Sequence, residues 1–496
     1  DAGDYYFTAA TDAHNAVNNI LAAKGYTVEN TDGRMTADGD VALTYKWTNA
    51  ALDSTTFATS ENGTAITNLF DEADPNKSSS EPGEVTWLSR SNWVATFPTQ
   101  PVVLNATQTL ADHLAFTRYD GSKADSVEMP TLGADNGLAL VSMIGADYDD
   151  PQWDTLLDQL TFNEMVNTIT LGFHNTAAVE SIGKTRTKDE NGPQGLTAAL
   201  TGGASAMCYT SEDVMAATFN VDLINDVGRC IGEDCLAMGY SGLYGPGINM
   251  HRTAYSGRNF EYYASDPFVA GTICAAEVNG IQSKGVYVYL KHVALNDSES
   301  SRRGVNTWLN EQAAREIYLE VADKAVTDGG AWSVMTGFNR WGATWCGAYD
   351  NLLTGFLRGE LGMRGMIITD YSGSSKYMDL ADGLIAGSDI WDSPDPTIHT
   401  TLAPKYENDA YIVTEMRESM HKILYTVANS NAMNGWSSAD RLKVITPWWK
   451  TALYALDTVL AVLTVLCIWR LVVAIKRKKT WTAEQAANTA SAQNQQ

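Results

Sequence analysis

Several short apolar runs in the second half of the chain end directly in polar side chains. Residues 366–369 are apolar or β-branched and are followed at once by Asp370, and residues 286–290 are followed by Lys291 and His292. Two further runs of this kind lie at residues 242–250 and 333–335. Strands buried on both faces of a parallel sheet have this pattern, and their carboxyl ends meet at one rim. We therefore predict that these polar groups share one site.

From about residue 151 onward, segments with helical periodicity alternate with these runs. Thr161 and Glu164 have the spacing of a capping box, in which each side chain bonds the backbone N–H of the other residue. Helices are expected over residues 153–160, 268–282, 311–327 and 351–360. The alternation predicts the α/β class with a parallel sheet, and about 280 residues fit a closed TIM-like (β/α)8 barrel over residues 151–435.

Residues 1–105 follow a different pattern. They are rich in Thr, Asn, Asp and Gly, and they contain short β-like runs at residues 41–45 and 85–88. This pattern predicts a partial β-rich module, either the tail of a β-sandwich or another accessory module. Residues 106–150 are expected to form a connector that contains a helix over residues 108–116.

The C-terminal part contains a long apolar segment, residues 451–475. At about 1.5 Å per residue, a helix of this length crosses a hydrocarbon core of about 30 Å. Trp448 and Trp449 precede the segment, as is typical of the aromatic belt at a membrane surface. We predict a single-pass transmembrane helix at the cell membrane, preceded by a juxtamembrane linker at residues 436–450.

The charges around this segment predict its orientation. The basic residues 476–479 follow it, and basic residues favour the cytoplasmic side. The tail at residues 476–496 is therefore expected in the cytoplasm and the globular part outside the cell. Asp457 and Arg470 interrupt the apolar segment, so the alternative is a helix that packs on the barrel.

The composition excludes some classes of partner. The chain has 34 basic against 59 acidic residues, a formal net charge of −25, so it lacks the basic footprint of a nucleic-acid-binding protein. This charge is compatible with a secreted protein that acts on a neutral ligand. The six cysteines form no CxxC pair, and no zinc pattern is present, so neither a metal nor another cofactor is expected.

The predicted rim combines a carboxylate with several cations. Asp370 at a strand end suggests a nucleophile, a general base or a metal ligand. The hydrogen-bond donors expected beside it suit a polyhydroxylated or anionic ligand, and Trp391 offers a flat apolar face to a sugar ring. These donors are Arg258, Lys291, His292 and Arg302.

The order and spacing of these motifs across residues 151–435 resemble the barrel domain of glycoside hydrolase family 3. The motifs are Gly245-Pro-Gly-Ile-Asn249, Gly257-Arg-Asn-Phe-Glu261, Lys291-His292, Met335-Thr-Gly-Phe-Asn339, Thr369-Asp370-Tyr371 and Ala386-Gly-Ser-Asp389. The resemblance implies a retaining, β-glucosidase-like enzyme with Asp370 as the nucleophile. It also implies that Arg258, Lys291 and His292 hold sugar hydroxyls, with Met335 near the same ring.

The chain also departs from the family pattern. Asn191-Gly192-Pro193 stands where the family has Asp-Gly-Pro, so an amide replaces a carboxylate that binds sugar hydroxyls. The family places its acid/base Glu in a second sandwich domain. We expect the domain order to be reversed here, as in some members of the family. The sandwich domain would then lie in a missing N-terminal part of a longer polypeptide. Residues 1–105 would then be the remnant of a fibronectin type III-like module.

Two functions are consistent with these residues. The first is a retaining glycosidase that hydrolyses β-glucosides or related glycosides at the non-reducing end. The alternative is a non-catalytic cell-surface carbohydrate-binding protein, which Asn191 and the absent acid/base favour and which Asp370 opposes. Glu299 is expected to pair with Arg302, and Glu261 to hold the rim, rather than to donate protons.

Overall fold

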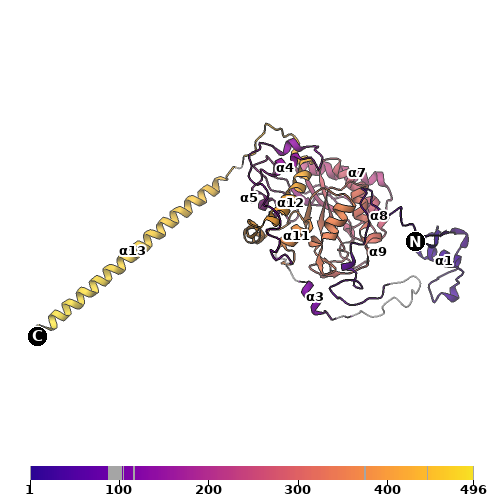
Figure 1. The fold of residues 1–496 in the computed structure, drawn as a ribbon, viewed down its shortest axis with the longest axis horizontal. Helices are drawn as coiled ribbons and strands as arrows, with labels where there is room; N and C mark the ends of the chain where they lie inside the picture. Colours follow the sequence, from indigo (N-terminus) through magenta and orange to yellow (C-terminus); the bar gives the residue numbers. More distant parts are fainter. Residues whose placement is uncertain are drawn as a thin grey trace. The chain divides into compact units, whose positions relative to one another are not determined.

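The computed structural model describes residues 2–87, 103, 105–114, 118–373, 376–443 and 445–494. The chain consists of two compact units, Asp1–Asp440 and Arg441–Gln496, which are described separately. The first unit holds the sheets and their covering helices, and the second consists mainly of one long helix (Figure 1).

Five parallel strands form the central sheet of the first unit. They are β3 (Asp189–Asn191), β4 (Gly242–Gly247), β5 (Tyr287–Val293), β7 (Ser333–Thr336) and β10 (Ile367–Thr369), in the order β10-β7-β5-β4-β3. Ile368 also forms a parallel bridge to Ile390 at the β10 edge. The α/β class and the parallel sheet are thus confirmed, and the described strands make up half of a TIM-like barrel.

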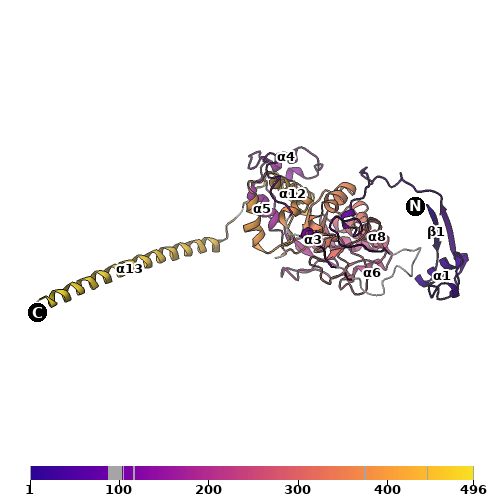
Figure 2. The ribbon, with the colours of Figure 1, turned by 60° about the horizontal axis from the view of Figure 1, so that its bottom comes forward.

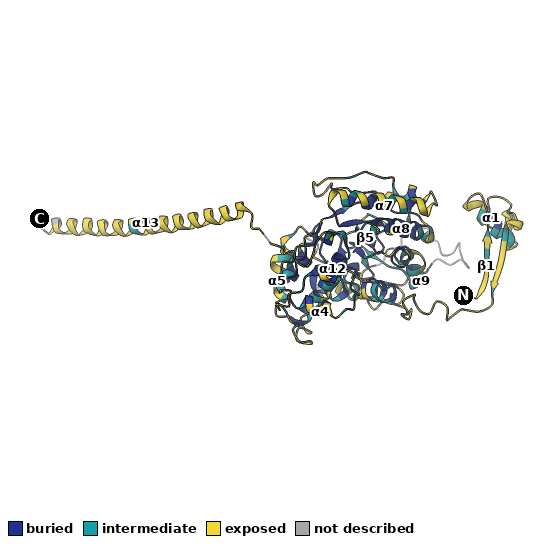
Figure 3. Cartoon of the chain, turned by 90° about the horizontal axis from the view of Figure 1, so that it is seen from above, coloured by how far each residue is buried: buried dark blue, intermediate teal, exposed yellow. Residues whose placement is uncertain are grey.

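Helices cover one face of this sheet. α7 (Val221–Met238), α8 (Pro267–Gln282) and α10 (Glu320–Thr327) pack beside one another. Figure 3 shows β5 buried beneath α7 and α8, while α7 keeps an exposed outer face. The helices approach closely because small residues line their contact. A Cβ on Gly228 of α7 would lie 2.3 Å from the carbonyl oxygen of Glu277 on α8, so only glycine fits there.

The opposite face of the sheet is the inside of the half-barrel. Met366, just before β10, and Ile368 of β10 pack there with Tyr244, Tyr289 and other inner side chains, whereas Ile367 belongs to the core cluster that contains the buried residues of α7 and α8. Neighbouring residues of a strand point to opposite faces. This alternation directs Asp370, the next residue in the inner series, into the barrel.

Further helices close the inner core. They are α4 (Gln152–Leu157), α5 (Phe162–Thr170), α11 (Leu380–Ala386) and α12 (Ala410–Ala428). The predicted capping box is confirmed at the start of α5, where Thr161 Oγ1 accepts the N–H of Glu164 and the Glu164 carboxylate accepts the N–H of Thr161.

Two predicted helices differ in detail. The helix expected over residues 311–327 is divided into α9 (Glu311–Ala313), a π-helical segment (Ala314–Tyr318) and α10. The one expected over residues 351–360 is π-helical throughout. A π-helix closes i→i+5 hydrogen bonds in place of the i→i+4 bonds of an α-helix, and the apolar pattern of these short segments indicates a helix but not its type.

The N-terminal part begins with a small sheet. β1 (Gly3–Thr8) and β2 (Thr44–Asn49) pair antiparallel, with α1 (Ala13–Ala23) beside them (Figure 2). The expected run at residues 41–45 becomes a 3₁₀ turn that leads into β2. The run at residues 85–88 contains no strand up to residue 87, and its last residue lies outside the described ones. The described residues here form a hairpin-like pair rather than a sandwich.

A later stretch of the N-terminal region joins the barrel core. Phe70 is fully buried and stacks on Trp341 with ring centroids 4.3 Å apart. The Glu311 carboxylate accepts the N–H groups of Leu69 and Phe70, at 3.2 and 2.8 Å. The connector helix α3 covers Gln108–His113, and the expected end of this helix at residue 116 lies outside the described residues.

The second unit contains α13 (Trp448–Gln493). Residues Trp448–Ser491 make it the one helix, among the described residues, that is long and apolar enough to cross a membrane. Its apolar side chains are exposed along its length (Figure 3).

Candidate active site

A cavity of about 530 Å³ opens at the carboxyl ends of the parallel strands. Seven of the eight predicted site residues line it, although they come from segments up to 180 positions apart. These seven are Asn191, Arg258, Lys291, His292, Arg302, Met335 and Asp370. The geometry therefore brings the predicted nucleophile and the predicted sugar-binding donors together, while their roles stay predictions.

Asp370 lies directly after β10, and the residue is 9% exposed. Its Oδ1 accepts the N–H of Tyr371 at 2.7 Å, and its Oδ2 has no hydrogen-bond partner among the described residues. Burial raises the pKa of Asp370 above 3.8, although the Tyr371 N–H and the nearby cations act to lower it. One carboxylate oxygen is thus positioned by the backbone, and the other has no hydrogen-bond partner among the described residues of a side chain that lines the cavity.

His292 approaches Asp370 without forming an ion pair. Its Nε2 lies 3.5 Å from Asp370 Oδ2 and 3.3 Å from Arg258 Nη1. Arginine can only donate, so the network assigns Nε2 as the acceptor and places the proton on Nδ1, 3.4 Å from the Tyr262 hydroxyl. Burial, with Arg258 and Lys291 nearby, lowers the pKa of His292 well below 6.5. A neutral His292 leaves Asp370 Oδ2 without a donor.

The cations of the cavity are held by two glutamates. Arg258 contacts Glu261 at 2.5 Å and Glu299 at 3.4 Å, and Lys291 lies 3.6 Å from Glu261. Arg302 pairs with Glu299 at 3.0 Å. Despite burial, the two cations hold the pKa of Glu261 below its usual value. Both glutamates therefore act as partners of the cations, as the sequence analysis expects.

Asn191 stands at the end of β3 beside a buried ion pair. His174 Nδ1 lies 2.9 Å from Glu190 Oε1, and the Asn191 N–H donates to the same oxygen at 3.0 Å. Thr201 also hydrogen-bonds to Glu190. Burial acts to lower the pKa of His174, but the bond to Glu190 outweighs this effect and the pKa is raised. This pair fixes the backbone that carries Asn191.

The structure corrects the expectation for Trp391. This side chain is fully buried, lies outside the cavity lining, and donates its indole N–H to the carbonyl of Met378 at 3.4 Å. It packs so closely on α11 that a Cβ on Gly383 would lie 2.7 Å from its ring. Because side chains alternate along an extended segment, Trp391 and its two neighbours point to opposite sides, and Trp391 packs on α11 instead of lining the cavity.

Sequence reasoning missed several residues that line the cavity. These residues are Phe173, His174, Tyr244, Arg303, Tyr371 and Asp392. One of them carries a weak signal, because Asp392 follows the apolar pair Ile390-Trp391, a shorter run than the one before Asp370. The others are placed by loops and by the inner face of β4, where composition alone gives no indication.

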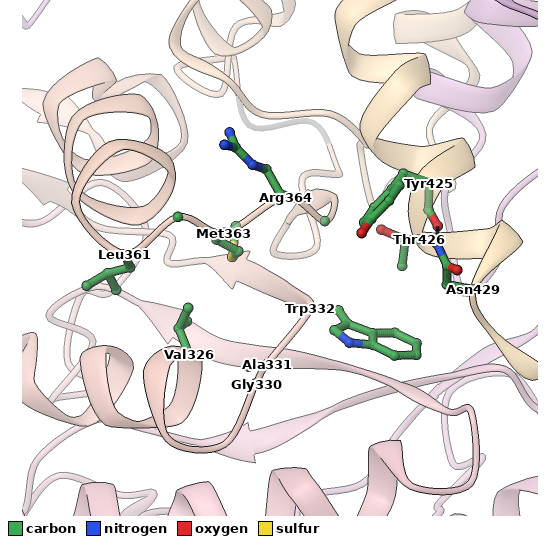
Figure 4. Close-up of a pocket in the computed structure, with 12 residues that line it drawn as sticks. Val326, Gly330, Ala331, Trp332, Leu361, Met363, Arg364, Tyr425, Thr426 and Asn429 are labelled. Atoms are coloured by element: carbon green, nitrogen blue, oxygen red, sulfur yellow. Dashed lines mark hydrogen bonds between the residues drawn. The ribbon is translucent and has the colours of Figure 1, made fainter. Parts of the chain in front are cut away.

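A second cavity, of about 500 Å³, lies at the opposite ends of β7 and β10. Figure 4 shows Trp332 on the segment before β7, Arg364 on the segment before β10, and Tyr425 on α12. No carboxylate is among the residues that line it. Of the two cavities, only the first has carboxyl groups among its described lining residues.

Comparison with known proteins shows what this part of the chain is similar to. Residues 175–398 match the sequence model of the family described as "Glycosyl hydrolase family 3 N terminal domain". The matched segment contains the whole parallel sheet, from β3 to β10. This segment is therefore similar to the N-terminal domain of that family.

The relatives of this domain are β-glucosidases. "Beta-glucosidase B" of Emericella nidulans is 33% identical over 251 residues, which cover 50% of this chain and 29% of that protein. "Thermostable beta-glucosidase B" of Acetivibrio thermocellus is 33% identical over 244 residues, which cover 47% and 32%. The chain spans about 30% of the length of the curated relatives it matches.

Solved structures agree with these sequence matches. The family 3 β-glucosidase of Bifidobacterium adolescentis has a TM-score of 0.51 at 27% identity, with 58% of this chain and 42% of that chain covered. β-Glucosidase 3B of Thermotoga neapolitana in complex with α-D-glucose has a TM-score of 0.51 at 26% identity, with 58% and 44% covered.

Proposed function

We propose that this chain carries the nucleophile of a retaining β-glucosidase-like enzyme. One observation carries the proposal: Asp370 presents an unbonded carboxylate oxygen to a cavity whose other polar groups are mostly hydrogen-bond donors. The relatives named above support glucosides as the substrate class. Arg258, Lys291, His292, Arg302 and Asn191 would hold the sugar hydroxyls, with Met335 against the ring.

The chemistry follows from this arrangement. Asp370 Oδ2 attacks the anomeric carbon, the bond from that carbon to the leaving oxygen breaks, and a glycosyl ester forms. Water then attacks the same carbon and restores the carboxylate. Ionisation of Asp370 is required, and the cations Arg302, Arg258 and Lys291 favour it.

The leaving oxygen needs a proton from a general acid. Glu299 is the carboxylate of the cavity beside the mouth, but Arg258 and Arg302 hold it as an ion pair. We propose that a further domain of the same polypeptide, a sandwich N-terminal to this chain, supplies the acid. General acid catalysis contributes about 10²- to 10⁴-fold, so this chain alone is expected to turn over activated aryl glucosides slowly and disaccharides hardly at all.

Covalent labelling tests the proposal directly. In a 2-deoxy-2-fluoroglucosyl fluoride, the 2-fluoro group slows both the formation and the hydrolysis of the glycosyl ester. The fluoride leaving group restores the rate of formation, so the ester accumulates. Peptide mapping by mass spectrometry should find one adduct, on Asp370. Reversible sugar binding without an adduct would instead support the second candidate, a non-catalytic carbohydrate-binding protein, which the amide at Asn191 favours.

We propose further that the half-barrel continues into a closed eight-stranded barrel over residues 151–435. Residues 1–105 are proposed to include the remnant of a fibronectin type III-like module, and residues 106–150 to connect it to the barrel. The strand pair β1–β2 is compatible with this assignment. A crystal structure of the longer polypeptide would contradict it if the sheet were open.

The location of the protein is proposed from α13. Residues 451–475 would cross the cell membrane once, with residues 436–450 outside and the tail at residues 476–496 in the cytoplasm. Length and composition support this span. Protease added to intact cells should remove the catalytic domain and leave the tail, and release of the whole protein by high salt would contradict a span.

A further inference from the structure

Asp392 is a second carboxyl group on the inner side of the half-barrel, next to Asp370. Ile368 and Ile390 pair as parallel neighbours, with the N–H of Thr369 donating to the carbonyl of Ile390 at 2.9 Å. Both isoleucines pack in the inner core. Since inward positions recur every second residue, the next inward pair is Asp370 and Asp392.

The backbone holds Asp392 firmly at this position. Its N–H donates to Thr369 Oγ1 at 3.1 Å, and its carbonyl accepts the N–H of Ser372 at 3.0 Å. The residue is 3% exposed and lines the cavity. It is therefore less accessible than Asp370, as expected for a group at the base of the cavity rather than at its mouth.

The carboxyl group itself is poorly satisfied by the protein. One contact is within hydrogen-bond range, from the His174 N–H to Asp392 Oδ1 at 3.4 Å, and that N–H also lies 3.2 Å from the Tyr244 hydroxyl. No Lys or Arg in the described part of the chain pairs with it, and the imidazole of His174 is bound to Glu190. A buried carboxyl group with so few partners has capacity to bind a ligand.

The charge state of Asp392 suits a neutral ligand. Burial, with the charge of Asp370 nearby, raises its pKa to about 7, and His174 opposes this shift. A protonated carboxyl donates one hydrogen bond and accepts another. Adjacent hydroxyl groups of a sugar ring present this combination of acceptor and donor.

We propose that Asp392 is a specificity-determining residue that binds hydroxyl groups of the sugar ring at the base of the cavity. The inference rests on the function proposed above and adds a sugar contact from a strand end other than those of Asn191 and Lys291. It also separates two roles. Asp370, the more exposed carboxylate, faces the anomeric carbon, while Asp392 orients the ring beneath it.

A double-mutant cycle between the protein and the sugar tests the contact. The binding of glucose and of its monodeoxy analogues would be measured by calorimetry for the unaltered chain and for Asp392→Ala. Glucose should bind about 10- to 100-fold more weakly to the variant, as expected for loss of one or two buried hydrogen bonds. At least one deoxy analogue should bind the unaltered chain more weakly than glucose does, and Asp392→Ala should not weaken its binding further.

Glu277→Gln is the matched control. Glu277 is also a buried carboxyl whose pKa burial raises to about 7, but it lies in α8 and bonds Tyr263 instead of lining the cavity. Its variant should bind glucose as the unaltered chain does. If Asp392→Ala does not fold, Asp392→Leu replaces it in the cycle, because its apolar side chain has a similar shape and removes both hydrogen-bonding atoms.

The outcomes separate this inference from the proposed function. Suppose that the fluorosugar labels Asp370, but that each deoxy analogue loses the same affinity relative to glucose for the unaltered chain and for Asp392→Ala. The contact is then refuted, and the proposed glycosidase activity stands. Equal losses for Asp392→Ala and Glu277→Gln also refute the contact. If the unaltered chain neither binds glucose nor becomes labelled, both proposals fall together.

Discussion

The two ends of the parallel sheet carry cavities of nearly equal volume but opposite chemical character. The cavity at the carboxyl ends, about 530 Å³, contains buried carboxyl and cationic groups, whereas the one at the amino ends, about 500 Å³, is lined by apolar residues, glycines and a few polar side chains, with Arg364 as the one charged residue among the described lining residues. Volume therefore does not identify the functional end. Strand direction does, because the βα loops that follow the carboxyl ends supply the chemistry of this fold.

The difference extends to how charge is buried at the two ends. At the carboxyl ends, Asp370 and Asp392 are buried with raised pKa values, and Lys291 is buried with a lowered one because of desolvation. Such groups reduce stability unless they are paired, and they cluster at functional sites. At the amino ends Arg364 stays exposed over the ring of Tyr148, 5.2 Å away.

The largest effect is expected from removing the nucleophile. Asp370→Gly should lower the turnover of 2,4-dinitrophenyl β-glucoside by about 10⁴-fold or more, because the carboxylate that forms the glycosyl ester is lost. Of the other described carboxyl groups that line this cavity, Glu299 is ion-paired and Asp392 is less exposed than Asp370. Added azide should enter the space left by the side chain and give the α-glucosyl azide, which NMR identifies. An unchanged rate, or a β-azide, would show that Asp370 is not the nucleophile.

The next effect concerns the buried cation that connects the site. Arg258→Met leaves Glu261 and Glu299 without their shared partner, which should lower the free energy of unfolding by about 3 kcal/mol. Urea denaturation followed by circular dichroism measures this change. Arg229→Met is the control, since Arg229 pairs with Asp226 on the surface and such pairs contribute about 0–1 kcal/mol. Equal effects of both variants would contradict the difference between buried and exposed charge.

The pH dependence of labelling is a smaller but sharper test. The fluorosugar reacts with the ionised form of Asp370, and burial raises the pKa of this group above 3.8. The labelling rate should therefore be full near neutral pH and fall as the pH drops through the raised pKa, so that the loss begins at a higher pH than an exposed aspartate would give. Rate constants measured between pH 3.5 and 8 check this. A rate that stays constant down to pH 3.5 would contradict the raised pKa.

The sequence predicts the strand-end residues because their signal is local. An apolar run followed by Asp370, or by Lys291 and His292, specifies a buried strand and its carboxyl end without knowledge of the rest of the fold. Trp391 shows where this reasoning fails. Its chemistry suggests a sugar platform, but the alternation along the segment directs its neighbour Asp392 inward instead.

The remaining features depend on tertiary contacts. His174 and Glu190 are 16 positions apart and meet only because a loop returns to β3. The tautomer of His292 follows from Arg258 and Tyr262, which no spacing rule connects to it. The packing of Phe70 on Trp341 places part of the N-terminal region in the barrel core, although its polar composition suggests a separate module.

The smallest expected effect lies at the amino ends of the strands. Trp332→Ala removes a half-buried aromatic side chain from the second cavity, which should lower the free energy of unfolding by about 1–2 kcal/mol, less than for a fully buried tryptophan. Because this cavity opens at the other ends of β7 and β10, the rate of Asp370 labelling should stay within about twofold. Phe338→Ala, a truncation in the lining of the first cavity, provides the contrast and should slow labelling. A tenfold loss for Trp332→Ala in a variant that remains folded would show that the two ends are coupled, and strand direction alone would then not define the site.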